Sequence, residues 1–341
     1  MQVEIPALLE RLKGPALQVA IITHMKPDGD ALGSSLGLAH LLLALGHHVT
    51  VISPTVFPDN MRWMPGSDQI LVAEPDDSAA RALMQRVDLL FALDFGKANR
   101  IHTLGDVLLS SPVSKVLIDH HLDFDDFAQH VFRDTEASST CELVYRLVRM
   151  LQPEGPLAPL VADCLYTGLY TDTNGFRIPA TSPAVHRMAA DLLESGVRPH
   201  VIQHYLFNQS TPEKLQFLGH ALANRLTLRP DLHAAWITVT LEDKRVYHLQ
   251  PGDTEGLVNL PLQVLGINLS LLLTEEENEI RLSTRSVGKF SANAFCQQFG
   301  GGGHYNAAGA RLKLPLAQAQ ERILAALEAR REELDYLFEG K

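Results

Sequence analysis

The sequence lacks the marks of several protein classes. It has three cysteines in 341 residues, Cys141, Cys164 and Cys296, and no CxxC pair. A disulfide scaffold and a cysteine zinc site are therefore excluded, and buried thiols are expected. It also has no long apolar run. The longest apolar stretch, 36–45, is interrupted by His40 and has about half of the residues that a membrane-spanning helix needs, which is ~20. We therefore expect no membrane partner.

Positive charge is also scarce. Lysine and arginine number 29 against 40 aspartate and glutamate residues, so the net charge is −11. A wide basic surface for a long nucleic acid duplex is therefore not expected, whereas a small anionic substrate held locally remains open. The N-terminal segment carries acids and has no apolar core of a secretory signal, which predicts a cytoplasmic protein.

What is present indicates a globular α/β protein. With 46% hydrophobic and 20% charged residues in 341, we expect two domains. In the first half, strand-like runs at 16–23, 48–53, 87–93 and 115–118 alternate with helical patterns at 30–45, 138–151, 157–170 and 182–194. This alternation predicts a doubly wound, mostly parallel sheet in a catalytic domain, 1–195.

A smaller α/β domain is expected at 215–341, after a linker at 196–214. Its expected elements are a helix at 212–224, strands at 233–240, 267–273 and 279–286, and a closing helix at 315–337. The glycine run Gly300–Gly303 predicts a turn, and the small residues that follow it are compatible with a helix.

Acidic and histidine residues follow the predicted strands. Three clusters directly follow strands and a fourth follows an apolar helix: His24, Asp28 and Asp30; Asp94; Asp119, His120 and His121; and Asp172. Any one of them alone fits a helix cap or a turn, such as a cap at Asp30. Because the carboxyl ends of parallel strands form the ligand-binding edge of a sheet, three clusters at one edge indicate a site.

The residue types at this edge favour metal ions. The candidate ligands are carboxylates and two imidazoles, without a thiolate: His24, Asp28, Asp30, Asp94, His120 and Asp172. Oxygen-rich sites favour Mg²⁺ or Mn²⁺, and imidazoles favour Mn²⁺ of the two. So many carboxylates would repel one another without a cation, so we expect two divalent cations about 3.5–4 Å apart, as in two-metal phosphoesterases.

The motifs resemble a known superfamily. The segments HxxPDxD, an isolated aspartate, DHH and TDT, in that order, are similar to the DHH phosphoesterases. In the second half, RLSTRS at 281–286 and FGGGGHYNAAG at 299–309 resemble the DHHA1 domain of that superfamily. Within it, the similarity is greatest to NrnA-like nanoRNases and pAp phosphatases.

The resemblance implies an active site in the cleft between the two domains and a role for each motif residue. His24 and Asp28 would hold one metal; Asp30, His120 and Asp172 the other; and Asp94 would bridge them. His121 would face the scissile phosphate, and Asp119 would orient a neighbouring histidine. Asn174 departs from the pattern, because relatives often have glycine there, and this affects the turn rather than Asp172.

Several glycines and one arginine allow two interpretations. The glycine run is either a flexible linker or a backbone nest in which Gly301, Gly302 and Gly303 cradle a phosphate with His304 as a donor. Arg285, at the end of a predicted strand, is either a solvated side chain or a bidentate phosphate ligand. Gly33 and Gly37 do not form a dinucleotide fingerprint, because GxGxxG is absent after the first strand.

The sequence therefore predicts a two-metal phosphoesterase. Its expected substrates are RNA or DNA oligonucleotides of about two to five nucleotides, cut to mononucleotides, and pAp, cut to AMP. The alternatives are a phosphodiesterase of cyclic dinucleotides or of pApA and pGpG, a RecJ-like exonuclease, a family II pyrophosphatase and a non-catalytic nucleotide sensor. The oligomeric state stays open, with a homodimer among the candidates.

Overall fold

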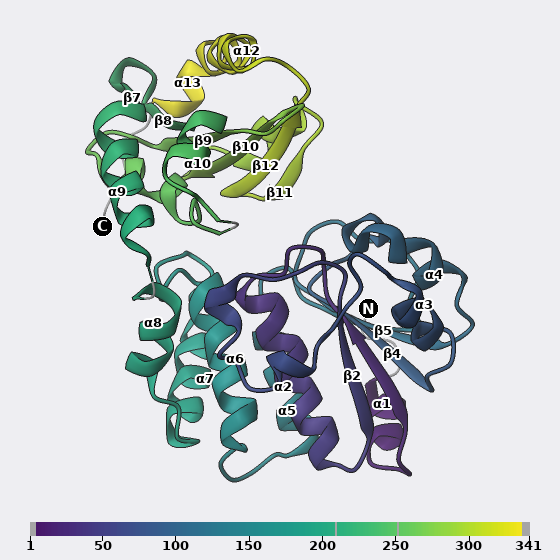
Figure 1. Cartoon of the computed structure of the whole chain (residues 1–341). Coiled ribbons are helices and arrows are strands. Elements are labelled where there is room, and N and C mark those ends of the chain that lie inside the picture. Colours follow the sequence, from purple (N-terminus) through teal and green to yellow (C-terminus); the bar gives the residue numbers. More distant parts are fainter. Residues whose placement is uncertain (1–4, 209, 251, 336–341) are drawn as a thin grey trace. The chain divides into compact units, whose positions relative to one another are not determined.

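The computed structural model describes residues 5–208, 210–250 and 252–335 (Figure 1). The chain forms two compact units, 1–209 and 210–341. The division falls inside the stretch predicted as a linker, which also contains the helix α8 (Pro199–Phe207). Each unit has a sheet of its own.

The sheet of the first unit is entirely parallel. Its strands lie in the order β3-β2-β1-β4-β5-β6 and span Gln18–Ile22 (β1), His48–Ser53 (β2), Leu71–Val72 (β3), Leu89–Leu93 (β4), Ser114–Asp119 (β5) and His130–Arg133 (β6). The strand order reverses between β1 and β4, and in open α/β sheets ligands bind beyond the carboxyl ends of the strands at such a point. His24 and Asp94, which follow β1 and β4, lie at this point.

Helices cover both faces of this sheet (Figure 1). The helices of this unit are α1 (Ile5–Leu12), α2 (Gly29–Ala44), α3 (Ser78–Met84), α4 (Gly105–Ser110), α5 (Thr140–Leu151), α6 (Pro159–Asp172), α7 (Pro183–Glu194) and α8. Alternate residues of β1 enter different cores: Val19 and Ile21 join one, and Ala20 and Ile22 the other. The doubly wound prediction is therefore confirmed. Among the helices in the described ranges, none is long and apolar enough to cross a membrane.

Helix α2, which begins at the sheet edge, and helix α6, which ends there, approach each other closely. Gly29, Gly33 and Gly37 recur every four residues and share one face of α2. A Cβ atom on Gly33 would lie 2.5 Å from the carbonyl oxygen of Cys164 in α6, and one on Gly29 would lie 2.3 Å from Oγ1 of Thr171. The glycines of α2 therefore permit helix packing, and this packing places the start of α2 beside the end of α6.

The second unit is the smaller α/β domain that was expected. Its sheet has the order β11-β12-β10-β9-β8-β7, with β8 and β9 parallel and the other pairs antiparallel. The elements are α9 (Pro212–His220), β7 (Leu226–Arg229), β8 (Ala234–Val239), α10 (Leu241–Val246), β9 (Leu269–Glu275), β10 (Ile280–Ser286), α11 (Ala292–Gln297), β11 (Gly302–His304), β12 (Ala307–Leu312), α12 (Leu316–Glu328) and α13 (Arg331–Leu334).

Three expectations for this unit were wrong in detail. The expected closing helix is two helices, α12 and α13, separated at Arg330, and its last residues, 336 and 337, lie outside the described ranges. The expected helix at 212–224 ends its regular part at His220 and continues as a π-helical turn. The small residues after His304 form the strand β12, because Ala308 and Ala310 pack into the core beneath α11.

The glycine contacts between α2 and α6 lead to a stability prediction. Gly33→Ala should lower the free energy of unfolding by about 1–3 kcal/mol, because the new methyl group overlaps a backbone atom of α6. Urea denaturation followed by circular dichroism measures this. Gly219→Ala is the matched control, because Gly219 lies in α9 with no atom within 4 Å of an added Cβ, and it should be neutral or slightly stabilising. Equal stability of both variants would show that the close packing is not required.

Candidate active site

The first group of candidate ligands combines Asp94 with two residues from the segment that follows β1. Ligand atoms of His24, Asp28 and Asp94 lie within 4.8 Å of one another. His24 Nδ1 lies 2.9 Å from the carbonyl oxygen of Met25, which directs Nε2 toward Asp94 Oδ2 at 3.4 Å. Asp28 is the N-cap of α2 and accepts a hydrogen bond from the backbone N–H of Asp30 at 3.1 Å. The cap is thus Asp28 rather than Asp30, and capping holds its carboxylate beside the group.

The second group joins Asp30, His120 and Asp172, also within 4.8 Å. His120 Nδ1 lies 3.2 Å from the carbonyl oxygen of Ala137. Its Nε2 lies 3.5 Å from Asp172 Oδ2, 3.7 Å from Asp94 Oδ1 and 3.9 Å from Asp30 Oδ2. A backbone carbonyl thus orients the imidazole, and one ring nitrogen faces three carboxylates. Asp94 adjoins both groups.

The first turn of α5 supports Asp30 and Asp94, the two most buried carboxylates among the candidate metal ligands. The backbone N–H groups of Thr140 and Cys141 donate to Asp30 at 2.7 and 2.8 Å, and the Thr140 hydroxyl donates to Asp94 at 2.9 Å. A helix N-terminus has unpaired N–H groups and favours negative charge. Thr140 was missed from the sequence. The sequence indicates the start of this helix through its N-cap residue Ser139, whose side chain accepts a hydrogen bond from the N–H of Glu142. Nothing in the sequence places this helix start beside Asp30.

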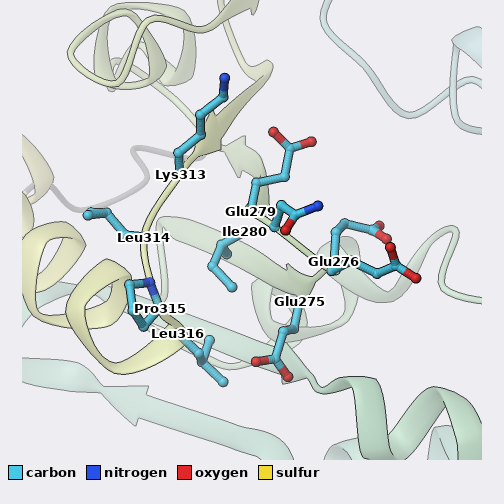
Figure 2. A pocket seen from close by; sticks show the side chains of 10 residues that line it. Glu275, Glu276, Glu279, Ile280, Lys313, Leu314, Pro315 and Leu316 are labelled. Atoms are coloured by element: carbon cyan, nitrogen blue, oxygen red, sulfur yellow. The ribbon is translucent and has the colours of Figure 1, made fainter.

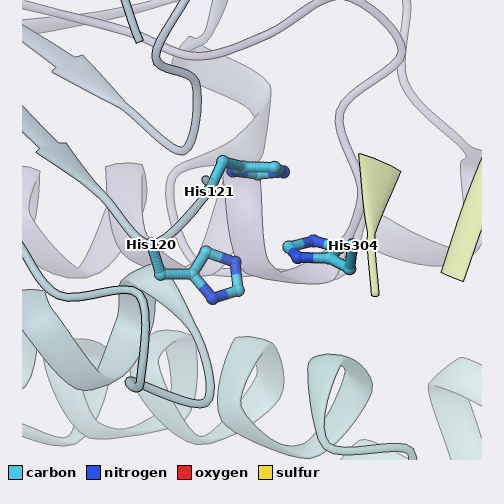
Figure 3. A group of neighbouring side chains, drawn as sticks. All are labelled: His120, His121 and His304. Carbon is cyan, nitrogen blue, oxygen red and sulfur yellow. The ribbon is translucent and has the colours of Figure 1, made fainter. Parts of the chain in front are cut away.

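The second histidine of the DHH motif is held differently. Its Nδ1 lies 2.7 Å from Oδ1 of the fully buried Asp119, so Asp119 orients His121 and leaves Nε2 on the far side of the ring. Figure 3 shows the His120 and His121 rings, whose centroids are 5.0 Å apart; His304, also drawn, is described below with its own unit. Arg133 was not predicted as a site residue from the sequence. Its Nε lies 3.7 Å from Oδ2 of Asp119, and its guanidinium donates a hydrogen bond to the carbonyl oxygen of His121.

The turn after Asp172 tolerates the departure at Asn174. Asn174 has φ of 48°, in the left-handed region that favours glycine and that asparagine also adopts. The Thr173 hydroxyl donates to the carbonyl oxygen of Leu169 at 2.6 Å and accepts from the N–H of Phe176 at 3.0 Å. The turn therefore keeps its hydrogen bonds without a glycine at that position.

Crowding divides the charge unequally among the carboxylates. Burial, together with the charge of Asp94, raises the pKa of Asp30 to about 7. Burial and the charge of Asp30 also raise the pKa of Asp172 well above its usual range. Burial acts on Asp94 in the same direction, but the hydrogen bond from His24 and the nearby histidines outweigh it and lower its pKa. Without a cation, protons on Asp30 and Asp172 therefore relieve the repulsion.

The histidines respond to the same carboxylates. Burial by itself would lower the pKa values of His24, His120 and His121, but neighbouring carboxylates outweigh it and raise all three. For His24 and His121 the largest single cause that raises the pKa is a direct hydrogen bond, with Asp94 and Asp119 respectively. The site thus attracts positive charge strongly, and its carboxylate and imidazole donors fit divalent cations such as Mn²⁺ or Mg²⁺.

The candidate phosphate ligands of the second unit share a face of its sheet. Arg285 of β10 is directly opposite Ala307 of β12, and Ala307 is directly opposite His304 of β11. Residues in one such row project from the same face. Gly301 and Gly303 allow close strand pairing. A Cβ atom on Gly301 would lie 2.0 Å from the carbonyl oxygen of Gly309, and one on Gly303 would lie 2.6 Å from the carbonyl oxygen of Ala307. Only part of the glycine run is therefore a turn, and Gly302–His304 is the strand β11.

A hollow in the same unit lies elsewhere on the sheet. Figure 2 shows it at the turn between β9 and β10 and the segment before α12, lined by Glu275, Glu276, Glu279, Ile280, Lys313, Leu314, Pro315 and Leu316. Its wall is acidic and lies at the end of β10 that is remote from Arg285. It therefore offers little to an anionic nucleotide.

Known proteins resemble this chain over nearly its whole length. Residues 18–169 match the DHH family, N-terminal domain, and residues 244–333 match the DHHA1 domain. The bifunctional oligoribonuclease and PAP phosphatase NrnA of Thermus thermophilus is 32% identical over 96% of this chain and 92% of its own length. The cyclic-di-AMP phosphodiesterase PdeA of Listeria monocytogenes is 25% identical over 94% of this chain and 49% of its own length. The crystal structure of an exopolyphosphatase-related protein from Bacteroides fragilis has 34% identity, a TM-score of 0.92 and coverage of 98% of this chain and 100% of its own.

The raised pKa values predict how the stability of the metal-free protein depends on pH. Asp30, Asp172 and the three histidines bind protons more tightly in the folded state than in the unfolded state. Protonation therefore stabilises the fold, and this stabilisation is lost as the pH rises through the folded-state pKa values, about 7 for Asp30. With a chelator present, the free energy of unfolding should fall by about 1–3 kcal/mol from near pH 6 to near pH 8.

Urea denaturation with and without Mn²⁺ measures this dependence. Added Mn²⁺ should raise the free energy of unfolding more at the higher pH, because the cation no longer competes with protons for the same ligands. A chelated protein that is equally stable at both pH values, or an equal gain from Mn²⁺ at both, would contradict the charge distribution described above.

Proposed function

The chain belongs to the DHH family and carries a DHHA1 domain. We therefore propose that it hydrolyses short oligonucleotides to mononucleotides and pAp to AMP. The observation that carries the proposal is the pair of ligand groups that adjoin at Asp94 beyond β1 and β4. Two such groups suit the two-cation hydrolysis of phosphoesters. The bifunctional relative supports the choice of substrates.

Six side chains would hold two divalent cations. His24 and Asp28 would bind one, Asp30, His120 and Asp172 the other, and Asp94 both. Bound there, the cations would supply Lewis acidity that activates a water molecule and neutralises charge on the phosphoryl group. The imidazoles among the carboxylates favour Mn²⁺, with Mg²⁺ as the alternative.

The remaining residues would bind and orient the substrate. His121 would hydrogen-bond an oxygen of the reacting phosphate through Nε2, because Asp119 holds Nδ1. Arg133 would keep Asp119 in place from behind. In the DHHA1 domain, Arg285, His304 and the backbone of Gly301–Gly303 would bind a phosphate that does not react, which sets the position of the substrate.

Short substrates fit the charge of the protein best. The net charge of −11 offers no broad positive surface to a long polyanion. The candidate phosphate ligands of the second unit are a single row on one sheet face. Few phosphates would therefore be bound at once, and affinity should fall only gently with added salt.

A substrate panel with Mn²⁺ tests the proposal. The panel contains pAp, pApA, RNAs of about two to five nucleotides, an RNA of about 24 nucleotides, cyclic di-AMP and pyrophosphate. We expect the highest kcat/KM for dinucleotides to tetranucleotides and a value at least about tenfold lower for the long RNA. Equal efficiency on long and short RNA would contradict the proposal, and a preference for cyclic di-AMP would favour the phosphodiesterase alternative.

Two variants test whether the first unit binds the metal ions and the second unit binds the substrate. Asp94→Asn should abolish turnover, at a cost of several kcal/mol of transition-state stabilisation, and should reduce bound Mn²⁺, because Asp94 adjoins both ligand groups. Arg285→Ala should keep its Mn²⁺ and lose kcat/KM. Metal analysis and steady-state kinetics on pApA distinguish the two. Turnover near the wild-type value in Asp94→Asn, or loss of metal from Arg285→Ala, would refute the assignment.

A further inference from the structure

Arg100 lies beside the candidate metal site without belonging to either ligand group. It is in the short 3₁₀ segment η3 (Ala98–Leu104), which follows β4 and Asp94. The backbone N–H of Met25 donates to the carbonyl oxygen of Arg100 at 2.8 Å, which places Arg100 next to the residue that follows His24. Ala98 and Ile101 are buried in the core, whereas Arg100 is exposed. The backbone thus holds Arg100 beside the residue that follows His24, at the rim of the site, with the arginine exposed.

The segment that carries Arg100 is firmly anchored. Asp125 accepts a hydrogen bond from the backbone N–H of Ala98 at 3.0 Å, and the N–H of Asp125 donates to the Gly96 oxygen at 2.7 Å. A Cβ atom on Gly96 would lie 2.2 Å from the Asp123 oxygen, so the two loops are in close contact. The backbone position of Arg100 is therefore set before any substrate arrives, which lowers the entropic cost of binding.

The charge of Arg100 reaches both sides of the site. Burial and carboxylates dominate the pKa values of His24 and His121, and the positive charge of Arg100 acts on both in the lowering direction. Within the described ranges, the side chain of Arg100 makes no ion pair and no hydrogen bond. Lys97, in the same segment, is paired with Asp123 at 3.3 Å. Of these two cations, Arg100 is thus the one available to an incoming anion.

We propose that Arg100 binds the phosphoryl group that is hydrolysed. The inference rests on the proposed phosphoesterase function and adds a substrate contact that belongs to the catalytic unit itself. A guanidinium donates two parallel hydrogen bonds to phosphate oxygens and keeps its charge at every working pH. Because negative charge on the phosphoryl oxygens must be stabilised during the reaction, a cation at this position accelerates the chemical step as well as binding.

Three variants test the contact. Arg100→Gln should lower kcat/KM by about 100-fold or more for both pAp and pApA, because both substrates contain the reacting phosphoryl group. Arg100→Lys should recover part of the loss, since a lysine keeps the charge but not the paired hydrogen bonds. Lys97→Gln is the matched control on the same segment and should stay within about threefold of wild type. Bound Mn²⁺ and thermal stability should be unchanged in all three.

Inhibition by two analogues of the dinucleotide separates substrate contact from a structural effect. With a negatively charged, slowly hydrolysed phosphorothioate linkage, the inhibition constant should rise about tenfold or more in Arg100→Gln. With a neutral methylphosphonate linkage it should change by less than about twofold, because there is no charge for the arginine to bind. Equal changes for both analogues would overturn the inference.

The outcomes also separate this inference from the proposed function. If wild type hydrolyses pAp and pApA and Arg100→Gln stays within about threefold of it, the inference fails and the proposed function stands. If Arg100→Gln loses its Mn²⁺, the residue supports the metal site instead, and the inference again fails. If wild type hydrolyses neither substrate, both fail together.

Discussion

The close contact between α2 and α6 is the constraint on which the site depends. Asp30 is the second residue of α2 and Asp172 the last residue of α6, so the distance between the two carboxylates follows from the distance between the helices. Gly168 in α6 completes the contact, because a Cβ there would lie 2.9 Å from the carbonyl oxygen of Gly29. Backbone meets backbone at this point, and a larger side chain on either helix would move a candidate ligand.

That contact creates an electrostatic problem, which the surrounding residues reduce. Three carboxylates converge on His120 Nε2 within 3.9 Å, and like charges this close raise the pKa values of Asp30 and Asp172. The N-terminus of α5 stabilises Asp30 with two N–H groups, and the histidines stabilise Asp94. These groups reduce the repulsion without removing it, so the folded chain is built to take up positive charge.

Contacts among the segments at the sheet edge also hold the residues around the candidate site in place. Asp119 and Arg133 hold His121 from β5 and β6, and Asp125 holds the segment that carries Arg100. The Arg133 contact joins β6 to the end of β5, and the Asp125 contact joins the loop after β5 to the segment after β4. The parallel sheet makes this possible, because the carboxyl ends of its strands lie along one edge. His121 and the backbone that carries Arg100 are thereby held in place, as the proposed binding of a phosphate requires.

The strand–helix alternation, the parallel sheet and the cluster of motif residues could be predicted from the sequence, because hydrophobic periodicity and position after a strand are local properties. It did not determine the strand β12 or the contacts of Thr140, Arg133 and Arg100. Ala307–Leu312 looks compatible with a helix, and only its pairing with β10 and β11 makes it a strand. Arg100 looks like any surface arginine until the Met25 hydrogen bond places it at the site. Such contacts join residues that are distant in sequence, so they form only when the whole domain folds and no local pattern predicts them.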